Sequence, residues 1–493
     1  MRAHLFAVAV TVAGCAVGPS TRIDPPAPHT VRRADTLTNP SARAFIDSLT
    51  RVRESEQLDS APAALWRPKP LSLDASSDLP WVEVLNDPAL TTLVQTAMRN
   101  NRDLQAAVAR VREYRALAGV GRSELFPQIS ANGSYSTNQS VFGSFGAQNF
   151  DAVRVTADLS WELDFWGRVR RQAQAGAFDL RGREEEERAT VLSLVSSVAT
   201  AYLELRELDQ NLAISEQTLE SRRASLALAR QRFEGGVISE LDVRQFEAEA
   251  AVPAIRVAEF ARLKASKEHQ LSQLLGQPPG PITRGNPLGA TVQAVTVPDS
   301  VPAELLLRRP DVRAAERDLQ SARARIGVAL GDRLPRIMVS GSYGRQRPGF
   351  DSLFKSANEI YTAQIGVSVP LFTGLRLENQ QRAASARADQ ARARFEQTVL
   401  GALREADDAL VGLRLSRDQL ASQQTQVQAL ARGFALAERR YQTGVSSYLE
   451  VLDAQRALFN AQLALVGNER QYLSATVQLY RALGGSWTGN RLP

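Results

Sequence analysis

The chain repeats its own sequence at a fixed offset of 208 residues, the difference between positions 440 and 232. The segment Arg440–Val445 (RYQTGV) matches Arg232–Val237 (RFEGGV), and the same offset places Pro335 on Pro127. A register that stays constant across separate segments is not an effect of composition. It indicates a tandem duplication in which each copy is one structural unit.

The sequence outside the duplication is short at the C-terminus and long at the N-terminus. Residues 16 to about 80 carry many prolines and serines with no sustained period, which is typical of an irregular tether with at most a short helix near Ala42–Glu56. The predicted segments are a lipoprotein signal peptide at 1–14, a lipidated irregular segment at 15–80, a first repeat at 81–285 with strands at about 128–163, a second repeat at 286–485 with strands at about 336–372, and a tail at 486–493.

The first fifteen residues have the features of an export signal. Arg2 gives a positive start, and the apolar run Leu5–Val12 is too short to span a membrane. The run leads into Val12–Cys15 (VAGC), which resembles the lipobox of bacterial lipoproteins, and Ala16 after the cysteine is typical of sorting to the outer membrane. The alternative is a chance cysteine in an ordinary signal peptide. Cys15 is the only cysteine, so an internal disulfide is impossible, and acylation there would anchor the chain to a lipid leaflet.

Each copy contains two segments in which apolar and polar residues alternate. They are Ile129–Thr137 and Val153–Leu163, repeated as Ile337–Arg345 and Tyr361–Phe372. Such alternation fits a half-buried sheet, and it fits equally a strand with lipid on one side and water on the other. Four strands cannot close a barrel with a lumen, and open strand edges are not tolerated in lipid. Either the sheets are soluble, or several chains share one barrel.

Long helices follow each pair of strands. Gly167–Glu234 and Leu375–Gln442 contain no proline, and shorter return helices are predicted at Leu241–Leu275 and Leu449–Leu483. The long segments have apolar residues at a seven-residue spacing, which keeps one stripe facing neighbouring helices in a supercoil. An ordinary coiled coil explains this spacing but not the strands beside it. The repeating positions are Leu205, Leu212, Leu219, Leu226 and Phe233 in the first copy and Leu413, Leu420, Val427, Phe434 and Tyr441 in the second.

Helix boundaries are predicted from turn and capping residues. The pair Gly235-Gly236 in the first copy and Gly444 in the second supply the positive-φ position that a helix end prefers, and hydroxyl side chains at Ser239 and Ser447 are expected to cap the return helices. A proline at position 253 predicts a kink in the first return helix. An earlier helix is expected to begin at an aspartate N-cap, residue 87, and to run unbroken to about residue 124.

Several motifs together give the chain a close resemblance to the TolC-type outer-membrane efflux factors, in their lipoprotein branch. The likeness covers roughly residues 81–485. The motifs that carry it are Trp81 with Asp87–Leu90 (DPAL), Leu163–Gly167 (LDFWG), Pro370–Gly374 (PLFTG), Glu450–Ala454 (EVLDA) and the two Arg-aromatic-x-x-Gly-Val tips.

The resemblance implies a fold and a function. It implies an α+β membrane protein whose duplicated chain gives four transmembrane β-strands and long coiled-coil-like α-helices per protomer. Three protomers would form a 12-stranded β-barrel in the outer membrane, continued by a helical barrel in the periplasm. The implied function is passive conduction of small molecules, docked onto an inner-membrane efflux pump through a periplasmic membrane-fusion adaptor. The alternative is a non-conducting coiled-coil envelope lipoprotein acting as a spacer or adhesin.

The resemblance also implies roles for residues at the two tips. Acids that match the periplasmic gate, Glu450 and Asp453, lie at i and i+3 on one helix face, and threefold repetition would gather up to six carboxylates that attract cations and raise their own pKa values. Two solvated surface acids are the alternative. The first-copy equivalents in the gate are Asp242 and Gln245; the tip latch would be Arg440, Tyr441, Arg232 and Phe233; and the adaptor contact would be Gly236, Val237, Ser239, Gly444, Val445 and Ser446.

Other functional classes find little support in the sequence. After removal of the signal only His29 and His269 remain, so neither a metal site nor a metal cofactor is expected, and the only predicted covalent group is the lipid at Cys15. Neither a Walker-type nucleotide loop nor a Gly-x-Ser-x-Gly elbow is found, so an enzyme is not expected. The net charge of +6 is spread along the chain with acids close to bases, which argues against nucleic-acid binding. The expected partners are outer-membrane lipid, two further copies of the chain, the adaptor and the pump.

Overall fold

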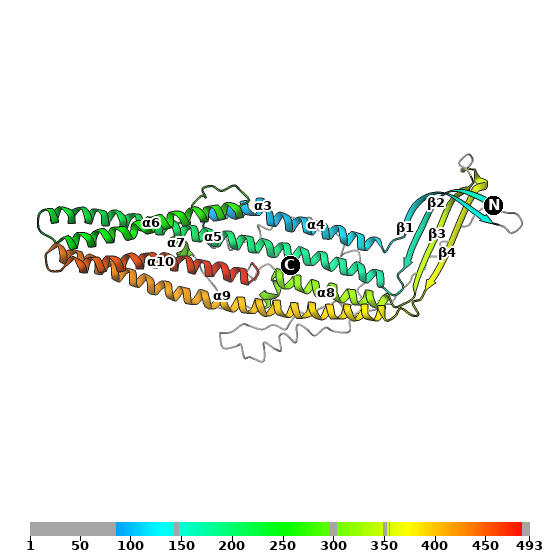
Figure 1. Cartoon of the computed structure of the whole chain (residues 1–493). Coiled ribbons are helices and arrows are strands. Elements are labelled where there is room, and N and C mark those ends of the chain that lie inside the picture. The colour runs from blue at the N-terminus through cyan, green and yellow to red at the C-terminus, as the bar shows by residue number, and fades with distance from the viewer. Residues whose placement is uncertain (1–84, 142–146, 295–302, 349–352, 354, 486–493) are drawn as a thin grey trace.

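The computed structural model describes residues 85–141, 147–294, 303–348, 353 and 355–485. The molecule is a long bundle of helices with a four-stranded sheet at one end (Figure 1). The predicted signal peptide, the tether with its lipidation site Cys15 and the C-terminal tail lie outside the described residues.

Two very long helices form the frame. Helix α5 (Arg168–Glu234) and helix α9 (Arg376–Gln442) each contain 67 residues, which corresponds to about 100 Å. The return helices are α6 (Glu240–Leu274) and α10 (Tyr448–Ala482), with 35 residues each. All these bounds are related by the offset of 208, so the duplication seen in the sequence is reproduced in the backbone. None of the described helices combines the length and the apolar character that a membrane crossing requires.

Shorter helices precede each pair of strands. Helix α4 (Arg102–Ser123) corresponds to α8 (Pro310–Gly331), again at the offset of 208. The prediction of one unbroken helix up to residue 124 is wrong, because α3 (Pro88–Asn100) ends before Asn101. The Asn101 side chain accepts the Leu104 N–H and starts a new helix. The remaining elements are α7 (Leu288–Ala294) and the 3-10 helices η4 (Ala303–Arg308) and η5 (Ser356–Asn358).

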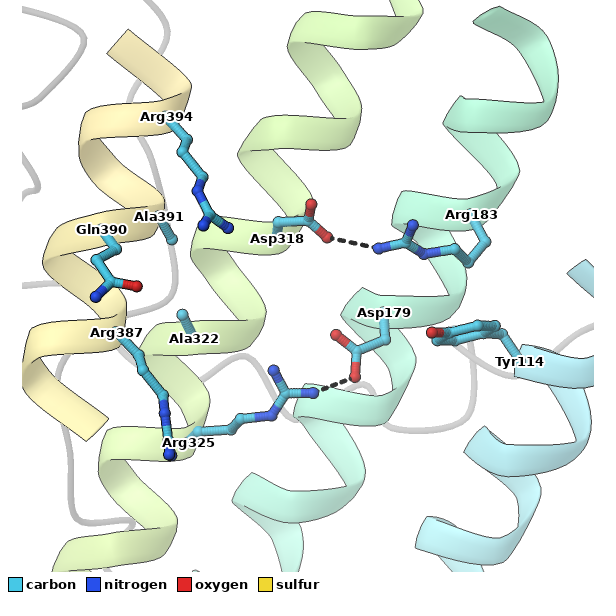
Figure 2. Close-up of a pocket in the computed structure, with 10 residues that line it drawn as sticks. All are labelled: Tyr114, Asp179, Arg183, Asp318, Ala322, Arg325, Arg387, Gln390, Ala391 and Arg394. Carbon is cyan, nitrogen blue, oxygen red and sulfur yellow. Dashed lines mark hydrogen bonds and ion pairs between the residues drawn. The ribbon is translucent and has the colours of Figure 1, made fainter. Parts of the chain in front are cut away.

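Near the sheet, the helices form a single layer in the order α4, α5, α8 and α9, as the close view in Figure 2 shows. Further from the sheet, α5 pairs with α6 and α9 pairs with α10. The main hydrophobic cluster lies midway along the molecule and joins both copies; it includes Tyr202 and Leu205 of α5 and Leu473 and Tyr480 of α10, all at most 1% exposed. α6 continues through Pro253.

The sheet is antiparallel with the order β1-β2-β3-β4. Its strands are β1 (Gln128–Val141), β2 (Ala147–Leu163), β3 (Arg336–Arg347) and β4 (Glu359–Ser368). The extension of the fourth strand to residue 372 is wrong. Pro370 has no N–H to give to a ladder, and the chain leaves the sheet just before it.

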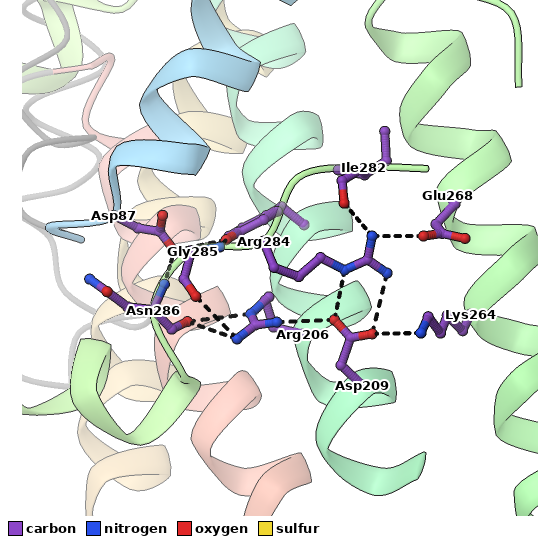
Figure 3. A network of polar contacts seen from close by, with 10 residues as sticks. Asp87, Arg206, Asp209, Lys264, Glu268, Ile282, Arg284, Gly285 and Asn286 are labelled. Carbon is purple, nitrogen blue, oxygen red and sulfur yellow. Dashed lines mark hydrogen bonds and ion pairs between the residues drawn. The ribbon is translucent and has the colours of Figure 1, made fainter. Parts of the chain in front are cut away.

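A polar network joins residues 284–286, in the segment between α6 and α7, to α5 (Figure 3). The Tyr202 hydroxyl donates to Asp87 Oδ2 and accepts the Gly285 N–H, both at 2.8 Å. Nearby, the Arg284 guanidinium donates to Asp209 at 3.0 Å. Burial and the hydrogen bond to the Asp87 carboxylate raise the pKa of Tyr202. This network fixes the middle of the molecule, between the sheet and the helical tips.

Candidate functional site

The register of the sheet gathers apolar side chains on one face of all four strands. Leu159 of β2 lies opposite Ile129 of β1 and Gly341 of β3, and Val339 of β3 lies opposite Ile365 of β4. The large apolar side chains of this face include Ile129, Tyr135, Tyr343, Tyr361, Ile365 and Val367, each between 57% and 83% exposed. The other face carries Ser130, Asn132, Asp158, Ser340, Thr362 and Gln364. An exposed apolar face of this extent needs a covering layer.

The length of the apolar face is measured along strand β2. From Leu163 to Val155 the strand advances eight residues, or about 26 Å at roughly 3.3 Å per residue. Next to Val155 in register is Arg345, which forms an ion pair with Glu359 at 3.3 Å, so charge first enters this face here. A transmembrane strand is tilted in the membrane and needs about 9–11 residues to cross it, and the segment from Val155 to Leu163 contains nine. The sheet therefore has the dimensions and the polarity of a membrane-spanning wall.

At the opposite end of the molecule, two helical turns form matched tips. Gly236 and Gly444 have φ values of 73° and 77°, as predicted, and within the pair Gly235-Gly236 the positive φ falls on the second glycine, since Gly235 has a φ of −82°. The Val237 N–H donates to the Arg232 carbonyl at 2.8 Å, and the same bond occurs in the second copy at 2.9 Å. Since added side-chain atoms at Gly236 and Gly444 would meet open space, the positive φ is what requires glycine there.

The two tips differ in how the return helix is capped. In the first copy the Asp242 backbone N–H donates to the Ser239 hydroxyl while the Asp242 carboxylate accepts the Ser239 N–H at 2.9 Å, which is a capping box. The Ser239 hydroxyl also donates to the Asp242 carboxylate at 2.7 Å, and this hydrogen bond, together with the one from the Ser239 N–H, lowers the pKa of Asp242. In the second copy Ser447 occupies the cap position but its hydroxyl makes no capping bond, so that prediction is wrong.

The predicted gate residues occupy the first two turns of the two return helices. Glu450 and Asp453 lie on α10, and each has an arginine 3.6 Å away: Arg440 beside Glu450, and Arg456 beside Asp453. Of the first-copy equivalents, Gln245 is exposed and Asp242 is engaged in the capping box. Both carboxylates of α10 are more than half exposed in the single chain, at 51% and 65%.

The predicted latch residues join the two tips within one chain. Arg232 of α5 donates to the Tyr441 hydroxyl of α9 at 2.7 Å, and its guanidinium lies 5.6 Å from the centre of the same ring. Arg440 instead faces Glu450, and Phe233 is 43% exposed. The structure therefore pairs Arg232 with Tyr441 across the copies.

The predicted adaptor-contact residues lie at the turns of both tips. Val237 and Val445 are 72% and 68% exposed, next to the positive-φ glycines Gly236 and Gly444. Ser239 is occupied in its cap, and the Ser446 hydroxyl is buried with no hydrogen-bond partner. Leu241 and Leu449, which were not predicted, are also exposed here and enlarge the apolar end surface.

The sequence did not predict an ion-pair cluster that joins α5, α6 and α10 next to the gate residues, on the side nearer the sheet. Arg222 is 2% exposed, donates to the Glu249 carboxylate at 2.8 Å, and lies over the Phe459 ring at 5.6 Å. Glu249 also binds Arg456, the partner of Asp453. Arg222 falls three residues after Leu219 of the heptad series, an inward-facing position. A charge at an inward heptad position was the signal that could have found this ion pair.

Among the residues that the structure describes, no group of three or more His, Cys, Asp or Glu side chains is placed to hold a metal ion.

Comparison with known proteins identifies the class to which this fold belongs. The sequence profile of the family described as "Outer membrane efflux protein" matches residues 93–277 and again 301–485, two matches separated by the same 208 residues. The chain belongs to the outer membrane efflux protein family, and the resemblance predicted from its motifs is confirmed.

Individual relatives agree with this assignment. The chain is 34% identical to the toluene efflux pump outer membrane protein TtgC of Pseudomonas putida, over 92% of this chain and 96% of that protein. It is 30% identical to the pyoverdine export outer membrane protein OpmQ of Pseudomonas putida, over 87% and 92% of the two chains. Among solved structures, the open state of the MtrE outer membrane channel of Neisseria gonorrhoeae is similar, with a TM-score of 0.75, 27% identity, and coverage of 83% and 92%.

Proposed function

We propose that this efflux protein is the outer-membrane channel of a three-part export system and conducts small molecules passively. The observation that carries the proposal is the sheet: its apolar face is exposed over the length of a membrane-spanning strand, and the outer edges of its first and last strands, β1 and β4, are unpaired within the described chain. Lipid on the apolar face and further copies of the sheet at the edges satisfy both requirements. Three copies would give twelve strands, enough to enclose a lumen.

The partners follow from this architecture. The chain supplies a wall but no energy source, so transport must be driven by an inner-membrane pump, reached through a periplasmic adaptor. The names of the relatives support an efflux pump as the partner. The exposed valines and leucines of the two tips form an apolar end surface on which an adaptor can dock. A catalytic role is not part of the proposal, because conduction needs only the shape and charge of the wall.

The gate is proposed at Glu450 and Asp453. In a trimer these carboxylates would gather around one axis, where like charges repel and cations are attracted. Their arginine neighbours, Arg440 and Arg456, already stand within ion-pair distance in the single chain. The link from Asp453 through Arg456 to Glu249 ties the second hairpin to the first, so a change in this chain of contacts would alter how the tips are held together.

Single-channel recording in planar bilayers tests the function and the gate together. The wild-type protein is expected to give discrete conductance steps, and the double variant Glu450→Ala with Asp453→Ala is expected to conduct more and to be less blocked by divalent cations. A matched control, Asp418→Ala with Glu438→Ala, removes the same charge from exposed positions of α9 in the same hairpin. Wild-type protein without steps would contradict the channel, and equal traces for both double variants would contradict the gate.

A covalent lipid at Cys15 is a separate part of the proposal. Incorporation of radiolabelled palmitate into the wild-type chain, and its loss in Cys15→Ser, is the expected result. Labelling that persists in the variant would show that the lipid, if present, is attached elsewhere.

A further inference from the structure

A cavity of about 330 Å³ opens in the helical layer between the sheet and the middle of the molecule (Figure 2). Its lining includes four arginines from three helices: Arg183 of α5, Arg325 of α8, and Arg387 and Arg394 of α9. Its size is within the range of small-molecule sites. Nothing in the gate or the tips uses this cavity, which lies far from both.

The charges of this arginine cluster are only partly compensated. Arg325 binds Asp179, and Arg183 binds Asp318 at 3.2 Å and also Glu186, which lies outside the lining. Arg387 and Arg394 form no ion pair or side-chain hydrogen bond with any residue that the structure describes. Four arginines against two aspartates leave the lining with two excess positive charges, or one when Glu186 is counted.

The duplication shows that this excess is specific to one copy. Subtracting 208 places Arg387 on Asp179 and Arg394 on Glu186. In the first copy these two positions are carboxylates that bind the arginines of the cavity; in the second copy they are arginines that add to them. Figure 2 shows Arg387 and Arg394 extending from α9 toward α8, the helix that carries the paired Arg325.

The side of the layer on which the cavity opens follows from its lining. Tyr114 of α4 and Arg394 of α9 both line it, although α4 and α9 are the two edges of the layer. Two edge helices can line one cavity only on the concave side of the layer. If three layers close into a cylinder, as the proposed function requires, this side faces the lumen.

We propose that the arginine cluster is a binding site for a phosphate-type oxyanion, inorganic phosphate or a phosphate monoester, on the wall of the channel. Guanidinium groups present paired donors that match the oxygens of such an anion, and a dianion would neutralise the excess charge. Arg387 and Arg394 lie 11 and 18 residues beyond the start of α9, roughly 16 to 27 Å below the sheet. The ligand is therefore a soluble anion in the lumen and not a lipid headgroup.

Binding is tested on the full-length protein in detergent by titration calorimetry with inorganic phosphate at constant ionic strength. Wild-type protein is expected to bind saturably. The variant Arg387→Asp with Arg394→Glu, which restores the first-copy residues, is expected to bind at least about tenfold more weakly. A matched control is Arg382→Glu with Arg404→Glu, which makes the same charge change at exposed positions of α9 outside the cavity and is expected to bind as wild type.

Three results would overturn the proposal. Phosphate that does not bind saturably would show that the arginines are simply solvated, and equal loss in both double variants would reduce the effect to the overall charge of α9. Vesicles of phosphatidic acid that compete with phosphate would place the site at the membrane surface. Since binding in detergent needs no conduction, a silent protein in bilayers that still binds phosphate would count against the proposed channel and leave the site standing.

Discussion

The two copies of the repeat have almost the same backbone, but they differ in how their polar side chains are paired. In the first copy, the polar side chains have partners: Asp242 completes a capping box in its own tip, and Asp179 binds Arg325 of α8. In the second copy, the hydroxyl of Ser447 caps nothing, and Arg387, the equivalent of Asp179, has no described partner.

This difference indicates that the two copies have different roles in the molecule. Duplication fixes the lengths of helices and the positions of turns, because both copies must pack side by side along the whole molecule. It does not fix the charges that face the lumen or the axis. In the first copy these polar groups are paired, while the second copy carries the exposed carboxylates of the proposed gate, each beside an arginine, and Arg387 and Arg394 of the anion site, which are unpaired among the described residues.

The largest expected effect concerns the residue just before α4 and just before α8, whose side chain bonds the end of a return helix in both copies but differs in type. Asn101 donates to the Leu274 carbonyl, and its equivalent Arg309 donates to the Ala482 carbonyl, both at 3.0 Å. Arg309 is also 6% exposed and binds Asp311 and the Glu405 carboxylate.

We expect Arg309→Ala to lower the free energy of unfolding by about 2–4 kcal/mol, because Asp311 and Glu405 lose their shared partner. The loss is not larger, because both carboxylates can still reach water. Asn101→Ala should lower the free energy of unfolding by about 1–2 kcal/mol, because α4 loses its N-cap and the Leu274 carbonyl loses one hydrogen bond. Urea unfolding of the detergent-solubilised protein measures both. An equal or larger cost for Asn101→Ala would contradict this order.

The next effect concerns a link present in one copy only. Tyr202 binds Asp87 through its hydroxyl, while the equivalent position in the second copy is Leu410. Tyr202→Phe leaves the Gly285 N–H without its acceptor and should cost about 1–3 kcal/mol of unfolding free energy. Tyr472→Phe is the control, since that ring is also buried but no hydrogen bond of its hydroxyl is described. Equal losses in the two variants would mean that packing and not the network matters at Tyr202.

Much of the fold was predictable because two independent signals agreed. The offset of 208 and the heptads predicted the long helices to within one residue at each end. The alternation at Val153–Leu163 predicted the sheet. The break at Asn101 was missed, because an asparagine within a helical pattern is a weak signal until its side chain is seen to accept the Leu104 N–H.

The site was less predictable than the fold. Glycines at the tips were found, since a positive φ is a local requirement that sequence expresses directly. The pair Arg232–Tyr441 was not found, because it depends on how the hairpins of the two copies pack against each other. The pair Arg222–Glu249 was not found either, because it depends on how α5 and α6 are rotated against each other within one hairpin. The arginine cluster was missed for the same reason: its members come from three helices.

The caps of the two tips provide a smaller and cleaner contrast. Ser239→Ala should weaken the first tip by about 1 kcal/mol, because it removes the capping hydroxyl of α6. Ser447→Ala is the matched variant in the second tip and should be neutral within about 0.3 kcal/mol, since its hydroxyl caps nothing. Hydrogen exchange of the amides in the first turn of each return helix measures the two effects in the same molecule. Similar loss of protection at both tips would remove the contrast between the copies.

The smallest effect is a dependence of the first tip on pH. Hydrogen bonds from Ser239 lower the pKa of Asp242 in the folded protein, so the stabilisation is complete above the unfolded value of about 3.9 and is lost as the pH falls through the lower folded value. Between pH 5 and pH 3, after correction for intrinsic exchange rates, the amides of residues 240–243 should therefore lose protection. Asp242→Asn should remove this pH dependence. The amides of residues 448–451 serve as the internal reference, because no carboxylate closes a box on Ser447 there. If both tips lose protection in parallel, acid acts on the whole bundle and the capping box has no separate role.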